Sequence, residues 1–94
     1  MLFHLCTRAS WDTTDADYAP ASLATEGFIH LSTAAQWPRS RARFFAGRRD
    51  LVLLVIDPAL LGDAVRYERA DGEDFPHLYA ALARTAVVEV RALP

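Results

Sequence analysis

Three histidines stand inside apolar segments of this chain, at His4, His30 and His77. Imidazole is the side chain best suited to proton transfer near neutral pH, and a buried neutral ring needs a partner for each nitrogen. One histidine in such a segment is typical of a core or interface residue, whereas three together predict a shared polar pocket. His77 stands between Phe75 and Tyr79 with strand spacing, so the three rings form either a slot for a flat ligand or half of a core.

The segment from Glu26 to Ser32 holds the densest group of polar residues. Its carboxylate precedes Gly27, which permits close approach of the backbone, and His30 and Ser32 then share one face of an expected strand. The alternative is a capped turn that leads into an ordinary strand. We place Glu26, His30 and Ser32 in the candidate site.

Zinc binding would need the three imidazoles to converge with a water molecule in an open tetrahedral site. No two of the histidines have the H-x-H or H-x-x-x-H spacing of a strand or helix chelate, so we predict no metal ion. Cys6 follows His4 by two residues on the same strand face, which suits either a Cys–His pair or a buried, inert thiol. The chain has no phosphate-binding glycine loop, no G-x-S-x-G turn and no C-x-x-C pair.

Many short elements must position these residues, because turn-forming residues interrupt the chain often. The expected strands cover residues 2–7, 28–32, 51–56, 64–69, 75–79 and 86–92. The expected helices are short: one after Ser10, one ending near Gly27, one that begins at Thr33 or Pro38 and ends at Gly47, one from Pro58 to Gly62, and a turn at 80–84. Strands outnumber helices without strict alternation, which predicts a single α+β domain over residues 1–94.

The run Leu51–Ile56 is apolar on both faces and is therefore expected to be the central strand of a mixed sheet. The helix that ends at Gly47 carries aromatic residues along one face. We expect it to pack on the central strand through Trp37, Phe44 and Phe45.

Composition argues against several classes of partner. The net charge is −2, so there is no basic field for DNA, and the longest apolar run is far short of the roughly 20 residues of a membrane helix. A single cysteine forms no internal disulfide and the N-terminal segment has no charged leader, so we expect a cytoplasmic protein. Arginines crowd residues 39–49 and acidic residues crowd 68–74, a pattern typical of a solvated helix that faces a solvated turn.

Several motifs follow one another along residues 2–88: L-F-H-L at the start, Trp11, Y-x-P-x-S-L from Tyr18, E-G-F-I-H-L-S from Glu26, Gln36, L-x-x-I-D from Leu53 and F-P-H-L-Y from Phe75. This order resembles the uncharacterised bacterial family called domain of unknown function 952. The E-G-F-I-H-x-S and F-P-H-x-Y motifs carry most of the likeness. The family name implies no activity.

Three segments are also similar to the ADP-ribosyltransferase superfamily. The L-F-H-x-x-T start resembles the L-Y-H-G-T first strand of those enzymes. F-I-H-L-S from Phe28 resembles the V-H-L-S segment of the RNA 2′-phosphotransferase branch, and Leu53–Asp57 resembles that branch's L-x-I-D segment. The resemblance implies a split β-sheet whose cleft binds a nucleotide such as NAD, with transfer or removal of an ADP-ribosyl or phosphoryl group.

That chemistry sets three requirements for the site. Breaking the ribose–nicotinamide bond builds positive charge on the sugar, so the site needs a grip on the ribose hydroxyls, an aromatic wall and a nearby negative charge. By motif position, the resemblance implies that His4 holds the hydroxyls. Tyr79 or Phe75 is the candidate wall, and Glu26 or Glu68 is the candidate carboxylate.

The chain departs from the ADP-ribosyltransferase pattern at two points. Leu5-Cys6 replaces the Gly-Thr that follows the first histidine, which removes the close backbone approach that glycine permits. The phosphate-binding arginines have no matched position, so Arg41 or Arg8 would have to substitute for them.

The leading hypothesis is an ADP-ribosyltransferase-like domain that binds a nucleotide or another small ligand in a cleft lined by histidines, with NAD as the expected substrate. The predicted catalytic residues are His4, His30 and Glu26, and the predicted ligand-binding residues are Tyr18, Ser32, His77, Tyr79 and Arg41. The alternatives are a non-catalytic module for a small metabolite or a partner protein, and a three-histidine metal site. The pattern fixes neither a cofactor nor an oligomeric state.

Overall fold

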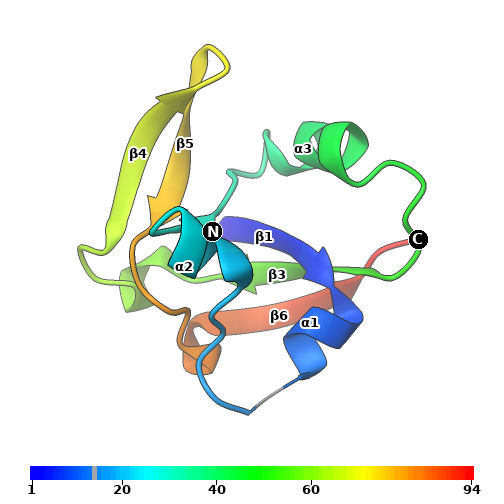
Figure 1. Cartoon of the computed structure of the whole chain (residues 1–94), viewed down its shortest axis with the longest axis horizontal. Helices are drawn as coiled ribbons and strands as arrows, with labels where there is room; N and C mark the ends of the chain where they lie inside the picture. The colour runs from blue at the N-terminus through cyan, green and yellow to red at the C-terminus, as the bar shows by residue number, and fades with distance from the viewer. Residues whose placement is uncertain (14) are drawn as a thin grey trace.

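The apolar run Leu51–Ile56 forms β3, and all six of its residues are buried. In this computed structural model, which describes residues 1–13 and 15–94, β3 lies between β1 (Leu2–Thr7) and β6 (Val87–Ala92). Both pairings are antiparallel. The prediction that this run is a central strand is confirmed, since it has a hydrogen-bonded neighbour on each side (Figure 1).

The second sheet is built on β5 (Glu73–Leu78), which lies between β2 (Ile29–His30) and β4 (Val65–Ala70). β4 and β5 form a hairpin. Its two-residue turn, Asp71-Gly72, has positive φ at both positions, 51° and 84°. Asp-Gly suits such a turn because both residues tolerate the left-handed region. The turn expected here is confirmed.

A short crossing joins the two sheets. After β2, Ser32 pairs with Phe3 of β1 through two backbone hydrogen bonds of 2.8 Å. The strand expected at 28–32 is therefore divided between the sheets. All pairings between the described strands are antiparallel, so the predicted mixed sheet is wrong. Local alternation indicates which residues form a strand, but long-range packing sets the direction of its partner.

The first helix, α1 (Arg8–Asp12), follows β1 without a loop. The side-chain oxygen of Thr7 accepts a hydrogen bond from the Ser10 amide at 3.1 Å and caps the helix. The start expected after Ser10 is wrong, because the cap lies at the end of β1.

The remaining helical elements are α2 (Ala21–Thr25), α3 (Trp37–Phe44) and two 3₁₀ turns, η1 (Pro58–Leu60) and η2 (Arg84–Ala86). As predicted, α2 ends before Gly27, and Asp57 caps η1 by accepting a hydrogen bond from the Ala59 amide at 3.0 Å. η2 lies at the end of the helical turn expected at 80–84 and beyond it. In the described part of the chain, no helix has the length and apolar character needed to cross a membrane.

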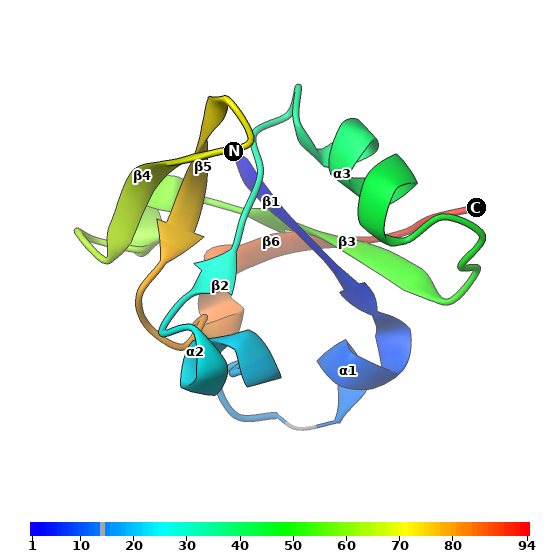
Figure 2. The same cartoon turned by 45° about the horizontal axis from the view of Figure 1, so that its top comes forward.

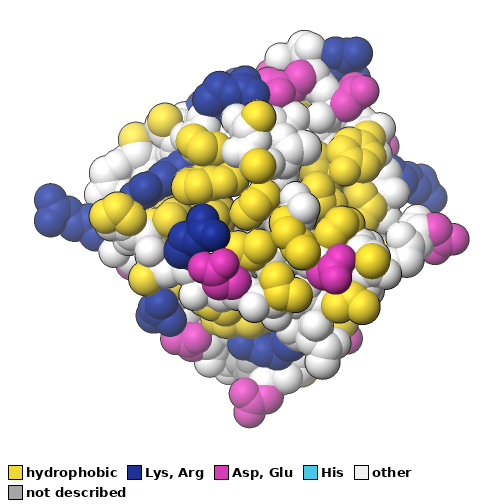
Figure 3. Space-filling model, turned by 180° about the vertical axis from the view of Figure 1, so that it is seen from behind, with side chains coloured by type: hydrophobic (Ala, Val, Ile, Leu, Met, Phe, Trp, Pro, Cys, Tyr) yellow, Lys and Arg dark blue, Asp and Glu magenta, His cyan; other side chains and the backbone are white. Residues whose placement is uncertain are grey.

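Two cores cover the two faces of the first sheet. The larger core lies between the sheets and includes Val52, Leu54, Ile56, Trp11, Tyr18, Ile29, Leu31, Leu78 and Leu82. The smaller core consists of Phe3, Leu5, Leu53 and Val55, with Trp37, Phe45 and Leu93 packed against it. Figure 3 shows hydrophobic side chains gathered across the middle of one side of the molecule, and none of the three histidines is visible there. The histidine side chains are therefore not exposed on that side of the molecule.

α3 covers the smaller core, but not with all of its aromatic residues. The Trp37 ring centroid lies 6.4 Å from that of Phe3, and Phe45 packs on the same core. Phe44 is 64% exposed, so the prediction that it packs on the sheet is wrong. The helix ends at Phe44, before the expected Gly47, and Phe45 has a φ of −129°, outside helical geometry. The chain turns there, which brings Phe45 to the sheet and leaves Phe44 outside.

Candidate functional site

A pocket with a volume of about 720 Å³ opens between α3 and the β4–β5 hairpin. The hairpin and the helix rise on the same side of β1, with the segment after β2 between them (Figures 1 and 2). His4, His30 and His77 all line this pocket, together with Glu26 and Ser32. The common cleft expected for the three histidines is therefore present.

His4 is hydrogen-bonded through both ring nitrogens. Its Nδ1 lies 2.6 Å from the His30 carbonyl oxygen, and its Nε2 lies 3.1 Å from the Tyr18 hydroxyl. A carbonyl only accepts, so Nδ1 carries the proton and Nε2 accepts from the hydroxyl. Desolvation lowers the pKa of His4 to about 4, which keeps the ring neutral near pH 7. His4 thus ties β1 to β2 and to the Tyr18 segment, and neither nitrogen is free for a ligand.

Tyr18 lies behind His4 in the larger core rather than in the pocket wall. Its ring centroid is 5.8 Å from that of Trp11 and 5.4 Å from that of His4, and its backbone pairs with Leu82. Burial raises the pKa of its hydroxyl. Tyr18 therefore positions His4. Of the predicted ligand-binding residues, Ser32 and His77 line the pocket, whereas Tyr18, Tyr79 and Arg41 do not.

His30 and Glu26 form an exposed pair in the pocket. Nε2 of His30 is 3.0 Å from Oε2 of Glu26, and about half of each side chain is exposed. The turn between them requires a φ of 89° at Gly27, a conformation that glycine adopts without strain. Because both side chains are open to the pocket, they can exchange a proton with a bound ligand.

His77 lies directly opposite His30 in the pairing of β2 with β5, and the ring centroids are 5.5 Å apart. Its ring stacks on Phe28 with a centroid distance of 4.0 Å and an interplanar angle of 16°. The residue is only 8% exposed. Phe28, rather than Phe75, therefore supplies the aromatic face beside this imidazole.

A carboxylate from the neighbouring strand holds this group in place. Oε1 of Glu68 lies 2.8 Å from Nδ1 of His77 and accepts a second hydrogen bond from the Tyr79 hydroxyl. The hydrogen bonds from Tyr79 and His77 hold the pKa of Glu68 below its usual range. The hydrogen bond between Tyr79 and Glu68 also raises the pKa of the Tyr79 hydroxyl. The two candidate carboxylates therefore contact different histidines: Glu26 contacts His30, and Glu68 contacts His77.

The other predicted side chains are placed differently. Ser32 is buried and lines the pocket beside the crossing to β1. Arg41 donates a hydrogen bond to the Pro94 carbonyl oxygen and, like Arg8, does not line the pocket. Cys6 is buried, and desolvation raises the pKa of its thiol, which favours the inert alternative. The structure therefore does not bring Arg41 to the histidines.

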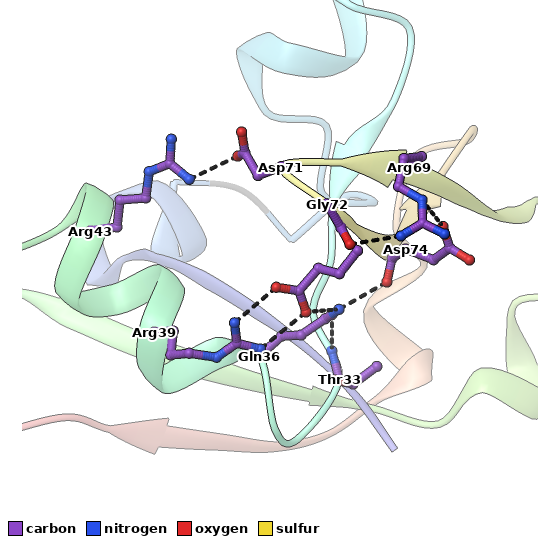
Figure 4. Close-up of polar contacts among 9 residues, drawn as sticks. Thr33, Gln36, Arg39, Arg43, Arg69, Asp71, Gly72 and Asp74 are labelled. Carbon is purple, nitrogen blue, oxygen red and sulfur yellow. Dashed lines mark hydrogen bonds and ion pairs between the residues drawn. The ribbon is translucent and has the colours of Figure 1, made fainter.

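Two arginines that the motifs did not single out, Arg39 and Arg43 of α3, line the pocket instead. Arg39 forms hydrogen bonds of 2.8 and 3.0 Å to Glu73, and Arg43 contacts Asp71 at 2.8 Å (Figure 4). Both carboxylates belong to the tip of the β4–β5 hairpin. The four-residue spacing of the arginines places them on one helix face, and this spacing was the available signal.

Gln36 completes the contact between α3 and the hairpin. It is only 6% exposed, and its side-chain amide donates to the Glu73 carboxylate at 3.0 Å and to the Asp74 carbonyl at 2.8 Å (Figure 4). Its amide oxygen accepts from the Thr33 backbone at 3.0 Å. That last bond joins the two ends of the turn from Thr33 to Gln36, just before α3.

Metal binding was one alternative for the three histidines. Among the described residues, no group of three or more histidine, cysteine, aspartate or glutamate side chains is arranged to hold a metal ion. The two nitrogens of His4 already have partners, and one nitrogen each of His30 and His77 contacts a carboxylate. The polar groups of this pocket are thus arranged as histidine–carboxylate pairs.

Comparison with known proteins places this chain in a family. The family model described as "Protein of unknown function (DUF952)" matches residues 5–90. The crystal structure of protein CC0527 from Caulobacter crescentus is similar, with 32% sequence identity and a TM-score of 0.91 over 99% of this chain and 85% of that chain. The solution NMR structure of CC0527 gives 32% identity and a TM-score of 0.84, over 98% and 83% of the two chains. No curated protein matches the sequence. The chain therefore belongs to the DUF952 family of proteins of unknown function.

Proposed function

We propose that the pocket binds a nucleotide, with NAD as the candidate ligand. The observation that carries this proposal is the make-up of the pocket wall, which combines aromatic and imidazole rings with two arginines, Arg39 and Arg43. A flat base stacks on rings and a phosphate matches guanidinium groups, so a ligand with both groups suits this wall. The volume of about 720 Å³ also falls within the roughly 300–1,000 Å³ that is usual for small-ligand sites.

Phosphate binding at this wall involves an exchange of partners. In the free protein, Glu73 and Asp71 occupy the guanidinium groups of Arg39 and Arg43. Three of the four side chains are more than half exposed and Glu73 is 34% exposed, and ion pairs open to solvent are worth only about 0–1 kcal/mol. The diphosphate of NAD carries two negative charges, against one on a carboxylate, and its oxygens accept bidentate hydrogen bonds from arginine. It can therefore replace the hairpin carboxylates without a large cost in stability.

The hydroxyl groups of the ribose need hydrogen-bonding partners, and the exposed pair of His30 and Glu26 can supply them. His4 has no free ring nitrogen, so it cannot grip a ribose hydroxyl while it holds His30 and Tyr18 in place. His30 and Glu26 are half-exposed and line the same pocket, and both side chains form hydrogen bonds with hydroxyl groups readily. We assign the ribose contact to His30 and Glu26, with His4 as the residue that positions them.

The likeness of three segments to the ADP-ribosyltransferase superfamily supports NAD as the nucleotide. It also supports transfer or removal of an ADP-ribosyl or phosphoryl group as the reaction. In such a reaction, Glu26 is a carboxylate of the pocket wall that can stabilise positive charge on the ribose.

Titration calorimetry with NAD, ADP and nicotinamide tests this proposal. His30→Ala and Arg39→Ala should each weaken NAD binding by roughly tenfold or more, because each removes a protein side chain that forms a hydrogen bond with the ligand. Arg41→Ala is the matched control, since Arg41 lies on the same helix but outside the pocket. Nicotinamide alone should bind more weakly than ADP. Undetectable binding of NAD at millimolar concentration to the wild-type protein would contradict the proposal.

A non-catalytic module that binds a small metabolite is the second candidate. The full hydrogen bonding of His4 favours it, because the residue that motif position assigns to the ligand has no free nitrogen. Incubation of the protein with the bound ligand, followed by mass spectrometry, separates the two candidates. A ligand that is recovered unchanged supports the module, and a converted ligand supports the transferase.

A further inference from the structure

One face of the second sheet carries a carboxylate, an imidazole and a phenol in mutual contact. Glu68 of β4 accepts hydrogen bonds from Nδ1 of His77, at 2.8 Å, and from the hydroxyl of Tyr79, just after β5. Exposed histidine–carboxylate pairs are mobile, but His77 is nearly buried and its ring is stacked on Phe28. Packing and hydrogen bonds together therefore fix the orientation of this imidazole.

The contact with Glu68 also fixes the position of the proton on His77. An ionised carboxylate only accepts, so Nδ1 of His77 carries the proton, and in the neutral ring the lone pair is on Nε2. Among the described residues, none forms a hydrogen bond with this Nε2. His77 lines the pocket. A carboxylate that holds one nitrogen of a histidine while the other is free is the arrangement in which histidine acts as a base.

The surroundings keep the two histidines of the sheet in separate roles. The charged and titratable groups around His77 are Glu68 and Arg66 on β4, Tyr79 after β5, His30 on β2 and Glu26 after α2. Arg66 is paired opposite His77, but its guanidinium group lies over the Tyr79 ring, 4.7 Å from the centroid. Glu26 contacts His30 rather than His77. Each imidazole thus has its own carboxylate, and the more deeply buried one has the fixed tautomer.

We propose that His77 is the general base of a hydrolytic reaction on the bound nucleotide, with Glu68 as its positioning residue; this inference rests on the proposed nucleotide binding. For NAD, water attacks the anomeric carbon of the nicotinamide riboside, and Nε2 of His77 takes a proton from that water. A C–O bond forms as the C–N bond breaks, and the electron pair of the C–N bond goes to the pyridinium nitrogen. Nicotinamide leaves as a neutral molecule and ADP-ribose remains, so the step needs no oxidant or reductant.

The first test measures the tautomer of His77 in the ligand-free protein by nitrogen-15 NMR. The wild-type ring should carry its proton on Nδ1 in the neutral form, and Glu68→Gln should lose this preference, because a side-chain amide can either donate or accept. A wild-type ring with the proton on Nε2 would overturn the proposal. This measurement needs no ligand and is therefore independent of nucleotide binding.

The second test follows nicotinamide release from NAD by chromatography, with NAD affinity measured in parallel by calorimetry. His77→Phe keeps a ring on Phe28 but has no base, so release should fall by about 10²–10⁴-fold while NAD affinity changes only slightly. Glu68→Gln should slow release less than His77→Phe, because the ring remains but its tautomer is no longer fixed by a carboxylate. Tyr67→Phe is the control on β4, since Tyr67 is exposed and does not line the pocket.

The outcomes separate this inference from the proposed function. If NAD binds to the wild type but nicotinamide is released no faster than in buffer, the general base is excluded and nucleotide binding stands. If NAD does not bind, both are excluded. If His77→Phe does not fold, Glu68→Gln decides: an unchanged tautomer together with an unchanged rate of nicotinamide release would exclude the positioning role.

Discussion

The two sheets have the same number of strands and the same antiparallel pairing, but their faces are used differently. In the first sheet, every residue of β3 is buried, because cores lie on both sides. In the second, one face joins the larger core through Ile29 and Leu78, and the other brings His30 and His77 to the pocket. The comparison indicates that the first sheet forms the centre of the fold, whereas the second presents polar side chains to the pocket.

The histidines follow the same division. His4 belongs to the first sheet, and its neutral ring has partners on both nitrogens, so it acts as a structural link. His30 and His77 belong to the second sheet, and each contacts a carboxylate through only one nitrogen. Residue type alone therefore does not indicate function in this pocket. The number of ring nitrogens left without a partner does.

The largest effect should come from the centre of the first sheet. Leu53 has 0% exposure, so Leu53→Ala should lower the free energy of unfolding by about 2–5 kcal/mol through lost burial and a cavity. Leu60→Ala is the matched control at a position that is 57% exposed, and its effect should stay within about 0.5 kcal/mol. Urea denaturation measures both. A loss below about 1 kcal/mol for Leu53→Ala would contradict the assignment of the first sheet as the folding core.

The next effect concerns pH and His4, the histidine of the first sheet. The pKa of His4 is about 4 in the folded protein, against an ordinary value of 6.5. Between these values the unfolded chain binds a proton at His4 that the folded protein does not. The stability contribution is therefore present above about pH 6.5 and is lost as the pH falls toward 4, by roughly 3 kcal/mol in total.

Denaturation of the wild type and of His4→Gln at pH 7, 6, 5 and 4 measures this contribution. The variant should be less stable at pH 7, because the His30 carbonyl and the Tyr18 hydroxyl lose a well-placed partner. The difference should narrow as the pH falls, since only the wild type loses stability through His4. Two parallel stability curves would show that His4 is protonated equally well in the folded and unfolded chains.

Much of the local structure could be predicted from the sequence, because it depends on neighbours along the chain. Two-faced apolarity indicated β3, the Asp71-Gly72 pair indicated the hairpin turn, and Asp57 indicated the cap of η1. The resemblance implied a split sheet, and two sheets are present. The antiparallel direction of every pairing between the described strands could not be predicted in this way, since it depends on contacts between segments far apart in the chain.

The sequence predicted which residues share the candidate site better than it predicted what each of them does. Motif order brought together His4, His30 and His77, which do share the pocket. The same motif order predicted that His4 contacts the ligand. In the structure, both of its ring nitrogens form hydrogen bonds within the protein, to His30 and Tyr18. The spacing on α3 could not show that Arg39 rather than Arg41 faces the pocket, because that depends on where the hairpin lies.

A smaller effect should separate the two aromatic residues at the end of α3. Both residues line the pocket, but only Phe45 also packs on the smaller core of the first sheet. Phe45→Ala should therefore lower the free energy of unfolding by about 1–2 kcal/mol, for a ring that is only half-buried. Phe44→Ala should change stability by less than about 0.5 kcal/mol but should weaken nucleotide binding. Denaturation measures the effect on stability and calorimetry the effect on binding. Equal losses of stability for the two variants would contradict the comparison.

The smallest effect on folding is expected for the ion pairs between α3 and the hairpin of the second sheet. The side chains of Arg43 and Asp71 are both more than half exposed. A double-mutant cycle with Arg43→Ala and Asp71→Asn should give a coupling of only about 0.2–1 kcal/mol at low salt, and less in concentrated salt. The Arg91–Glu89 pair of β6 is a control of similar exposure outside the pocket.

The same pair should have a clearer effect on the ligand than on the fold. Asp71 and a phosphate group compete for Arg43, so Asp71→Asn removes the competitor and leaves the guanidinium group available. NAD and ADP should then bind several-fold more tightly, whereas nicotinamide, which has no phosphate, should bind as before. Glu89→Gln should change neither, since it lies outside the pocket. Weaker ADP binding to Asp71→Asn would mean that this carboxylate itself contacts the ligand, and the charged edge of the second sheet would then have a different role from the one argued for Arg43.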